Sequence, residues 1–365
     1  MTPSTGRAAI YDAPGKPFRV VEYPVRAVRD GEVLVRVSMC TICGSDVHSY
    51  RGRRPNPVPG ILGHEIIGTV EAVDGAVTDL RGERVRPGDR ITWTEYWTTA
   101  PSYERDVLDL PQKSPDVRKY GHERADVDPH LNGGLAEYCY LQRGTGIVPL
   151  PAELSDEEAT PLNCGAATMV AVTEAAEVSL ADAVVVQGLG LLGLYGVALA
   201  KARGARLVIG IDAVGARRAM AHRFGADVTL DATRSGDELD RAVRDATGRD
   251  GADAAIEVCG NPAAIPAGVR MLRIGGRYVI AGCVMPEAHV TIDANMLLRR
   301  LITVRGVHNY HPRHLVQAVD FVVGARGRVP FGALVDARFG LDEVDAAFAR
   351  AADRTAIRAA VVPHG

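Results

Sequence analysis

Thiol and imidazole side chains occur at three places that could supply metal ligands. Cys40 and Cys43 form a CxxC pair, His64 stands beside a carboxylate in Gly63-His64-Glu65, and Cys164 follows Asn163. A CxxC pair suits a zinc knuckle or a redox pair, but a knuckle needs a second ligand pair nearby and cysteine supplies none. Thiolates and an imidazole from distant segments would instead leave one position of a tetrahedral zinc open. For each isolated cysteine a buried apolar role is the alternative, and we expect it for Cys40, Cys139, Cys259 and Cys283.

A glycine-rich segment supplies a second candidate site. The residues Gly188-Leu189-Gly190-Leu191-Leu192-Gly193 follow an apolar strand pattern at 183–187 and precede a helical pattern at 194–202. In a dinucleotide-binding fold the first two glycines allow a tight turn and close approach of a pyrophosphate, and the third lets helix and strand pack closely. The helix N-terminus offers free N–H groups to the phosphates. We therefore expect cofactor contacts at Gly188, Gly190, Leu191 and Gly193.

Asp212 ends the next strand pattern, 22 residues after Gly190. A carboxylate about 20 residues after the glycines accepts hydrogen bonds from the adenine ribose and repels a 2′-phosphate. This spacing favours NAD over NADP. Arg217 lies just beyond Asp212 and could accommodate that phosphate, so NADP is the less favoured alternative.

The elements that must position these residues change along the chain. Short strand patterns bounded by proline and glycine dominate the first part, for example 32–37 and 66–73. After Pro151, alanine-rich helices alternate with strands, which is typical of a parallel, doubly wound sheet. The two flanks are therefore expected to fold together around a central α/β domain.

Composition limits the class of protein. The 365 residues carry 42 basic and 45 acidic side chains, a net charge of −3, which argues against a nucleic-acid binder. No apolar run is long enough for a membrane span and no signal peptide is recognisable, so we expect a cytoplasmic protein without a membrane partner. Only four of the 42 basic residues are lysine, which we interpret as a compositional habit of the genome.

The motifs together resemble those of the zinc-dependent medium-chain alcohol dehydrogenases. Gly44, Ser45 and His48, then Gly63-His64-Glu65, Cys164 and the glycine loop occur in that family's order, and the likeness runs from Arg19 to Val362. The resemblance implies an α/β protein with a GroES-like, mostly-β catalytic domain (1–163 and 308–365) and a doubly wound Rossmann NAD-binding domain (164–307).

The resemblance also assigns roles to particular residues. Cys43, His64 and Cys164 would bind the catalytic zinc, Glu65 would be a nearby acid that can approach the metal, and Asp46 would orient His64. Ser45 and His48 would relay a proton from a zinc-bound alcohol to water. Thr168 would lie beside the nicotinamide and Arg358 would reach the cofactor phosphates. The reaction implied is hydride transfer between an alcohol and NAD through a zinc-bound alkoxide.

One segment departs from the family pattern. Many relatives bind a second, structural zinc through four cysteines, and alignment of 110–123 with a related subgroup places those positions at Ala100, Tyr103, Asp106 and Ser114. None can form a Cys₄ site, so we expect one zinc per chain. This lobe (residues 97–131) would then be held by packing and by ion pairs among Glu104, Arg105, Asp106, Lys113 and Arg118, or remain mobile.

The substrate is open at this stage. Residues 110–123 and 308–310 resemble alcohol dehydrogenases associated with phosphonate metabolism, and Arg53 and Arg54 could bind an anionic substrate, although a solvated turn is the simpler interpretation. Tyr96 and Trp97 could line the pocket or simply pack. The alternatives are an enzyme that recycles its NAD internally on a sugar- or cyclitol-like metabolite, and a catalytically silent NAD-binding protein. We expect a homodimer or homotetramer formed through the edge of the central sheet.

Overall fold

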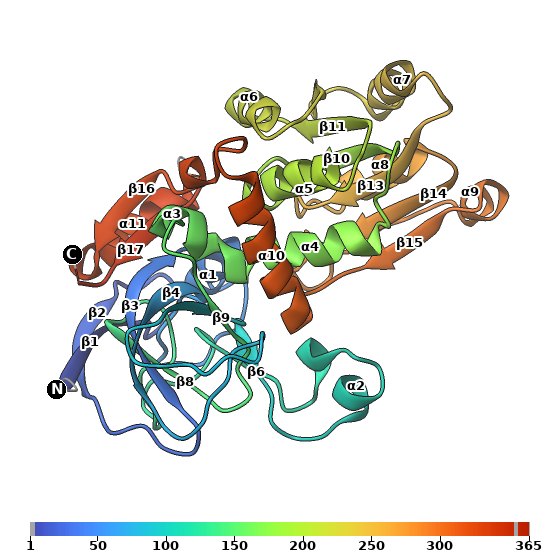
Figure 1. Ribbon diagram of the computed structural model, residues 1–365. Coiled ribbons are helices and arrows are strands. Elements are labelled where there is room, and N and C mark those ends of the chain that lie inside the picture. The colour runs from blue at the N-terminus through green and yellow to red at the C-terminus, as the bar shows by residue number, and fades with distance from the viewer. Residues whose placement is uncertain (1–3, 354–356, 365) are drawn as a thin grey trace. The chain divides into compact units, whose positions relative to one another are not determined.

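The computed structural model describes residues 4–353 and 357–364 (Figure 1). The chain divides into two compact units. The first comprises the residues up to Ala167, His311–Ala325 and the residues from Phe331, and the second comprises Thr168–Tyr310 with Arg326–Pro330. The structure thus changes units four residues after the predicted first boundary and three after the second, and it adds the short return segment 326–330 to the second unit.

The first unit is built on a seven-stranded, mostly antiparallel sheet. Its strands run in the order β16-β17-β3-β4-β5-β9, and β8 pairs with β3. The strands of this sheet are β3 (Val33–Thr41), β4 (Glu65–Val73), β5 (Arg90–Trp93), β8 (Tyr138–Leu141), β9 (Ile147–Pro149), β16 (Ala337–Gly340) and β17 (Ala359–Val362). The C-terminal β17 pairs directly with β3, so the two ends of the chain fold together as the sequence predicts.

Burial explains why these segments form strands. In the middle of β3, the half-buried Arg36 and Ser38 alternate with the buried Val35, Val37 and Met39, as expected for a strand with one face on the core. Two small sheets accompany the main one, β1 (Thr5–Ile10) with β2 (Arg19–Pro24), and β6 (Tyr96–Trp97) with β7 (Arg118–Lys119). The helices of this unit are α1 (Gly44–Tyr50), α2 (Tyr103–Asp106), α3 (Asp156–Ala159), α10 (Pro312–Ala325) and α11 (Val344–Ala352), with 3₁₀ turns at Pro111–Lys113, Thr160–Asn163, Phe331–Leu334 and Leu341–Glu343.

The second unit is a parallel six-stranded sheet in the order β12-β11-β10-β13-β14-β15. Its strands are β10 (Ala183–Gln187), β11 (Leu207–Asp212), β12 (Val228–Asp231), β13 (Ala252–Glu257), β14 (Leu272–Ile280) and β15 (Thr303–Gly306). Every residue of β10 is buried, as in strands covered on both faces. This strand order confirms the expected doubly wound dinucleotide-binding fold.

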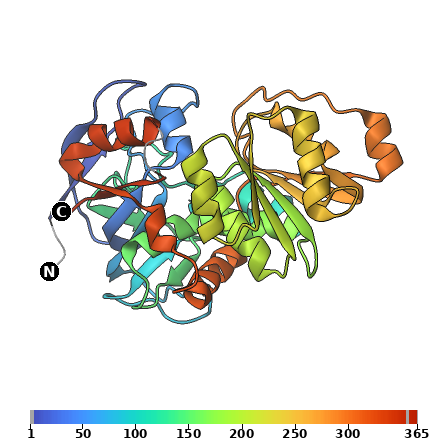
Figure 2. The same ribbon diagram turned by 90° about the horizontal axis from the view of Figure 1, so that it is seen from above.

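Helices cover both faces of this parallel sheet (Figures 1 and 2). They are α4 (Gly165–Ala175), which begins at the unit boundary, α5 (Leu191–Ala202), α6 (Gly215–Arg223), α7 (Gly236–Thr247), α8 (Ala264–Arg270) and α9 (Ala294–Arg300). The pairs α5–α6 and α7–α8 each pack together. The strand order reverses between β10 and β13, which is where such folds bind ligands, and the glycine loop follows β10. Within the described residues no helix is both long and apolar enough to cross a bilayer.

Candidate functional site

Four side chains from distant segments of the first unit meet at one point. Cys43, His64, Glu65 and Cys164 each place a ligand atom within 4.8 Å of the others. Cys43 directly precedes α1, His64 and Glu65 lie at the start of β4, and Cys164 stands between a 3₁₀ turn and α4. His64 and Glu65 are buried, and both cysteines are half-buried. The structure thus brings together the three predicted ligands and the predicted nearby acid.

One buried carboxylate positions two of these segments. Asp46 accepts hydrogen bonds from the N–H of Cys43 at 2.9 Å and from the N–H of Gly63 at 3.2 Å. Its Oδ1 also lies 3.3 Å from His64 Nδ1, on the side of the ring away from Nε2. Burial opposes ionisation of both groups, but their mutual attraction outweighs it, so the pKa of His64 is raised and that of Asp46 is lowered. Asp46 thus lies behind the imidazole as the resemblance predicts, and its role in orienting a metal-bound His64 stays a prediction.

Two further residues fix the segment that carries His64. Gly63 has a φ of +90°, and a Cβ there would lie 2.6 Å from the Cys40 sulfur, so only glycine fits. Asn163 donates its side-chain N–H to the His64 carbonyl at 2.9 Å, which ties the Cys164 segment to the histidine.

The two ligand thiols lie close enough to affect each other's ionisation. The neighbouring Cys164 thiol, together with Arg358 and His64, lowers the pKa of Cys43 despite its burial. Two thiolates and an imidazole are the donor set that zinc prefers. The residues present therefore fit a zinc ion held by Cys43, His64 and Cys164.

Two residues hold the carboxylate of Glu65. Arg358 donates to both of its carboxylate oxygens at 2.9 Å, and Thr41 donates at 2.6 Å. Burial raises the pKa of Glu65 to about 7, against the opposing charge of Arg358. The guanidinium also lies 3.6 Å from the Cys43 sulfur. Here Arg358 thus contacts the metal centre, and its contact with cofactor phosphates stays a prediction.

Three residues near the ligands escaped the sequence analysis. Glu95 Oε2 lies 3.8 Å from His64 Nε2, and Lys119 Nζ lies 3.4 Å from Glu95 Oε1. The His122 ring stacks on the His64 ring with centroids 5.7 Å apart. Glu95 is buried, and although burial opposes ionisation, Lys119 and His64 lower its pKa. The available signal was Lys119 itself, one of only four lysines in a chain whose basic residues are mostly arginine.

The predicted relay and substrate residues are placed less completely. Ser45 and His48 are half-buried and lie three residues apart on α1, which puts them on one face of that helix. Arg53 is exposed and Arg54 is half-buried. Arg54 is close enough to His122 that burial, His64 and this arginine together lower the pKa of His122 to about 3. Their roles toward a substrate stay predictions.

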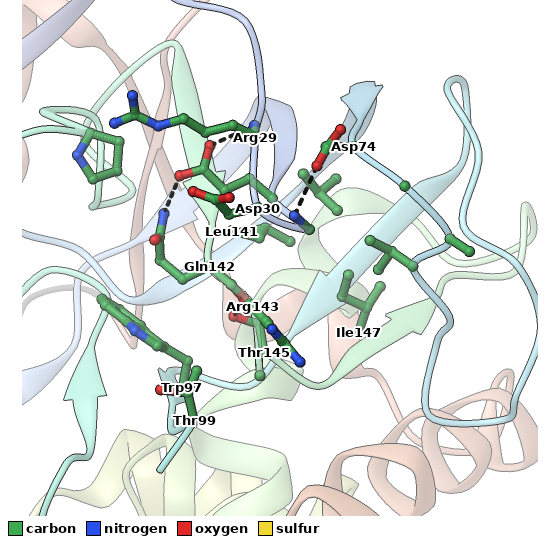
Figure 3. A pocket seen from close by; sticks show the side chains of 18 of the residues that line it. Arg29, Asp30, Asp74, Trp97, Thr99, Leu141, Gln142, Arg143, Thr145 and Ile147 are labelled. Carbon is green, nitrogen blue, oxygen red and sulfur yellow. Dashed lines mark hydrogen bonds between the residues drawn. The ribbon is translucent and has the colours of Figure 1, made fainter.

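Tyr96 and Trp97 belong to the packed interior of the first unit. Both are buried, and the Trp97 ring packs on Tyr120 at 4.8 Å with the Arg118 guanidinium over it. Trp97 lines a cavity of about 790 Å³ together with Arg29, Asp74, Gln142 and Arg143 (Figure 3). None of Cys43, His64 and Cys164 lines that cavity.

The three glycines in the loop of the second unit differ in the space around the position of a Cβ atom. A Cβ at Gly188 (φ +96°) would lie 2.7 Å from the Cys259 backbone, and one at Gly193 would lie 1.8 Å from the Gly188 carbonyl oxygen. Beside Gly190, by contrast, the Cβ position is open, with no atom within 4 Å. Gly190 caps α5, which begins at Leu191. This open position at a helix N-terminus has room for a phosphate, and the cofactor contacts at the loop stay a prediction.

Asp212 stands at the end of β11 beside this loop. It is 8% exposed and accepts hydrogen bonds from the N–H groups of Leu189 and Val214, both at 2.8 Å. Arg217 NH1 lies 3.8 Å from the carboxylate, whereas Arg218 is engaged by the Asp212 carbonyl and by Asp231. Thr168, predicted beside the nicotinamide, is half-buried on α4.

Two cysteine expectations were wrong. Cys40 and Cys139 are buried as expected, but Cys259 is exposed and Cys283 half-buried. Both follow the carboxyl ends of parallel strands, β13 and β14, where loops replace the covering helices. Although Cys259 is partly exposed, neighbouring residues shield its sulfur from water and raise its pKa to about 12, and the same cause raises the pKa of Cys283 to about 11, so neither is a ready nucleophile.

The lobe is held differently from the expected ion-pair network. Of the expected residues, Arg105 pairs with Asp106 at 2.8 Å, but Arg118 pairs with Glu123. The centre of the lobe is Asp116, whose carboxylate accepts hydrogen bonds from four donors. These are the Ser114 hydroxyl at 2.6 Å, the Thr98 hydroxyl, and the N–H groups of Thr99 and Ala100 at 2.8 and 2.7 Å. The Ser102 hydroxyl joins Ser114 at 2.9 Å.

Comparison with known proteins agrees with this geometry. Residues 29–152 match the alcohol dehydrogenase GroES-like domain, and residues 192–324 match the zinc-binding dehydrogenase domain. The chain is 33% identical to 5-exo-hydroxycamphor dehydrogenase of Pseudomonas putida over 330 residues, 89% of this chain and 90% of that protein.

Solved structures show the same fold. An alcohol dehydrogenase of Thermotoga maritima superposes with a TM-score of 0.93 at 31% identity, covering 98% of this chain and 99% of that one. A zinc-binding dehydrogenase of Sinorhizobium meliloti bound to NADP superposes with a TM-score of 0.87 at 25% identity, covering 99% of this chain and all of that one. The chain belongs to the zinc-dependent medium-chain dehydrogenase/reductase family. It is therefore an oxidoreductase that uses zinc and a nicotinamide cofactor.

Proposed function

We propose that this protein is an alcohol dehydrogenase that interconverts an alcohol and an aldehyde or ketone with NAD. The meeting of Cys43, His64 and Cys164 within 4.8 Å is the observation that carries the proposal. This donor set leaves one position of a tetrahedral ion for a substrate oxygen.

The bound groups supply the difficult chemistry: zinc acidifies an alcohol or polarises a carbonyl, and the nicotinamide carries the hydride. The chain supplies orientation and proton transfer. Asp46 holds the His64 ring and the Cys43 segment in place. Ser45 would accept the hydroxyl proton of the substrate while giving its own hydroxyl proton onward toward His48, which lies on the same face of α1 and would release a proton to water.

The cofactor preference follows from the end of β11. Asp212 accepts the ribose hydroxyls of NAD and repels the 2′-phosphate of NADP. Arg218 is engaged by the Asp212 carbonyl and by Asp231, and the Arg217 guanidinium lies 3.8 Å from the Asp212 carboxylate. We infer that NAD is preferred.

We further infer one zinc per chain and a homodimer or homotetramer. The hydrogen-bonded lobe presents hydroxyls and a carboxylate where a Cys₄ site would need thiolates. The strand β15 closes the parallel sheet with all four residues exposed, and an uncovered edge strand favours pairing with a second copy.

The substrate is a small alcohol or carbonyl compound. Arg54, half-buried close to His122, supports an anionic group such as a phosphonate at some distance from the reacting carbon. A panel of simple aliphatic, polyol and phosphonate-bearing alcohols, with matching aldehydes, followed at the NADH absorbance, tests the proposal. We expect NAD-dependent turnover by protein carrying about one zinc per chain. A zinc-loaded protein that binds NAD and oxidises or reduces none of the panel would refute it.

A further inference from the structure

A fully buried carboxylate in the second unit has no part in the mechanism above. Glu257 is the last residue of β13. Its Oε1 accepts a hydrogen bond from the N–H of Gly260 at 2.6 Å, and its Oε2 accepts one from the N–H of Gly282 at 3.1 Å, which also reaches the Glu257 carbonyl at 3.0 Å. Gly260 lies in the loop after β13 and Gly282 in the loop after β14. One carboxylate therefore joins two loops at the carboxyl edge of the parallel sheet.

The two loops touch each other where Glu257 holds them. A Cβ at Gly260, where φ is +71°, would lie 3.0 Å from the Gly282 carbonyl oxygen. A Cβ at Gly282 would lie 2.6 Å from the Gly260 nitrogen and 2.7 Å from Glu257 Oε1. These distances leave no room for a side chain, so the backbones of both loops close directly around the carboxylate. The two loops and Glu257 thus form one packed assembly.

This assembly also lies against the glycine loop that follows β10. The N–H of Val258 donates to the Gln187 carbonyl at 2.9 Å. A Cβ at Gly188 would lie 2.7 Å from the Cys259 backbone, and Cys259 itself is exposed. The loop held by Glu257 is therefore a direct neighbour of the segment that is expected to bind the pyrophosphate.

The position of these loops in the sheet indicates which part of the cofactor they would meet. A dinucleotide binds across the point where the strand order reverses, one half of it on each side, and here that point lies between β10 and β13. Asp212, at the end of β11, is expected to bind the adenosine ribose. The nicotinamide riboside would then lie on the other side, at the loops after β13 and β14. Because Glu257 is buried and its oxygens face backbone N–H groups, it would act through these loops and not by contact with the cofactor.

We propose that Glu257 is a positioning residue that holds the loops after β13 and β14 in the arrangement that binds the nicotinamide riboside part of NAD. This inference rests on the proposed use of NAD. It separates the two halves of the cofactor site, since loss of a Glu257 contact would disturb one half and leave the adenosine half as it is.

The test compares NAD with ADP, which keeps the adenosine and both phosphates but lacks the nicotinamide riboside. Glu257→Gln keeps the size of the side chain, but its NH₂ group faces one of the two N–H donors and that contact is lost. By calorimetric titration of the zinc-loaded protein we expect the Kd of NAD to rise about tenfold, in the range of one lost hydrogen bond to a charged group, and the Kd of ADP to change less than about twofold. Glu257→Asp, which keeps the charge on a shorter side chain, should weaken NAD selectively in the same way.

Asp253→Asn is the matched control, at the opposite end of the same strand. The Asp253 carboxylate is also buried and accepts a hydrogen bond from the N–H of Ala183 at 2.7 Å. Its loss should lower the free energy of unfolding but leave the ratio of the NAD and ADP dissociation constants unchanged. Hydrogen exchange in the cofactor-free protein should quicken in the peptides containing Gly260 and Gly282 in Glu257→Gln, and not in Asp253→Asn.

Three results would overturn the proposal: equal weakening of NAD and ADP in Glu257→Gln, unchanged NAD binding although the two loops exchange faster, or the same change of ratio in Asp253→Asn. The titrations need no turnover. If no alcohol is oxidised, the proposed function fails, while the binding of NAD and ADP still decides the role of Glu257. A wild type that binds ADP but gains nothing from the nicotinamide riboside would refute both.

Discussion

The metal centre and the lobe each bring polar groups from separate segments to one point, but they use different side chains. At the metal centre, the ligand atoms of Cys43, His64 and Cys164 converge to within 4.8 Å of one another. In the lobe, the Asp116 carboxylate receives four hydrogen bonds from hydroxyl and N–H groups. Deprotonated thiolates and an imidazole nitrogen that converge on one point need a cation to offset their charge and lone pairs. Oxygen acceptors surrounded by donors are already satisfied.

On the proposed stoichiometry of one zinc per chain, hydrogen bonds would hold this lobe where many relatives use a metal. A structural zinc contributes folding free energy directly, so its loss must be offset. Hydrogen bonds to one charged carboxylate offer a replacement of about 1.5–3 kcal/mol each when buried, and less at the half-buried Asp116.

The largest expected effect comes from removing a ligand. Cys43→Ala should lose the zinc and fall to background turnover, while NAD binding stays nearly intact because the glycine loop belongs to the second unit. Elemental analysis, NADH formation and NAD titration check this. Cys139→Ala is the matched control, since that buried thiol is not a ligand, and should keep its zinc. Full zinc content in Cys43→Ala would contradict the ligand assignment.

A smaller effect is expected from Asp46, which touches the ligand segments without binding the ion. Asp46→Asn should weaken zinc binding by about tenfold to a hundredfold, the usual cost of losing a carboxylate behind a metal-bound histidine. Competition with a chelator measures the change. Asp116→Asn should leave zinc affinity unaltered, and a drop there would mean that the lobe does hold a metal.

A change at Asp116 should affect the stability of the lobe and not the metal centre. Asp116→Asn removes the charged acceptor and should destabilise the lobe by about 1–3 kcal/mol. Hydrogen exchange should quicken at the amides of Thr99 and Ala100 while the zinc content stays at one per chain. Asp126→Asn breaks only an exposed ion pair with Arg124 and should cost less than about 1 kcal/mol. If the two variants destabilised the lobe equally, Asp116 would not be the residue that holds it together.

The smallest effect is a pH dependence confined to the lobe. Burial by itself would raise the pKa of Asp116, but the four hydrogen-bond donors hold this pKa below its ordinary value of 3.8. The folded lobe therefore binds this proton more weakly than the unfolded chain, so Asp116 stabilises it above about pH 4. That contribution is lost as the pH falls further. Amide exchange of the lobe at pH 7 and pH 3 should show the loss in the wild type but not in Asp116→Asn.

Much of the second unit could be predicted from local sequence. The patterns at 183–187 and 207–212 became β10 and β11 with the same bounds, because strands covered on both faces are continuously apolar. The glycine loop could be recognised because its three glycines, strand and helix are contiguous. The zinc ligands are far apart and were identified only through the resemblance to a family.

The remaining features depend on contacts that local pattern does not encode. Glu95 and Lys119 approach each other because β6 pairs with β7 across a long loop. Asp116 collects donors from 98–114 through turns that have no periodicity. Cys259 was taken for a core residue because its type is usually buried, whereas its position at the end of β13 exposes it.

The three glycines of the loop are required for different reasons: two of them for folding and one, by prediction, for cofactor binding. Alanine at Gly188 or Gly193 would collide with backbone already present, so either change acts on the fold itself. Alanine at Gly190 meets nothing in the protein alone. If the pyrophosphate lies over Gly190 as predicted, Gly190→Ala should fold normally and bind NAD more weakly, which would provide a folded reference protein with impaired cofactor binding.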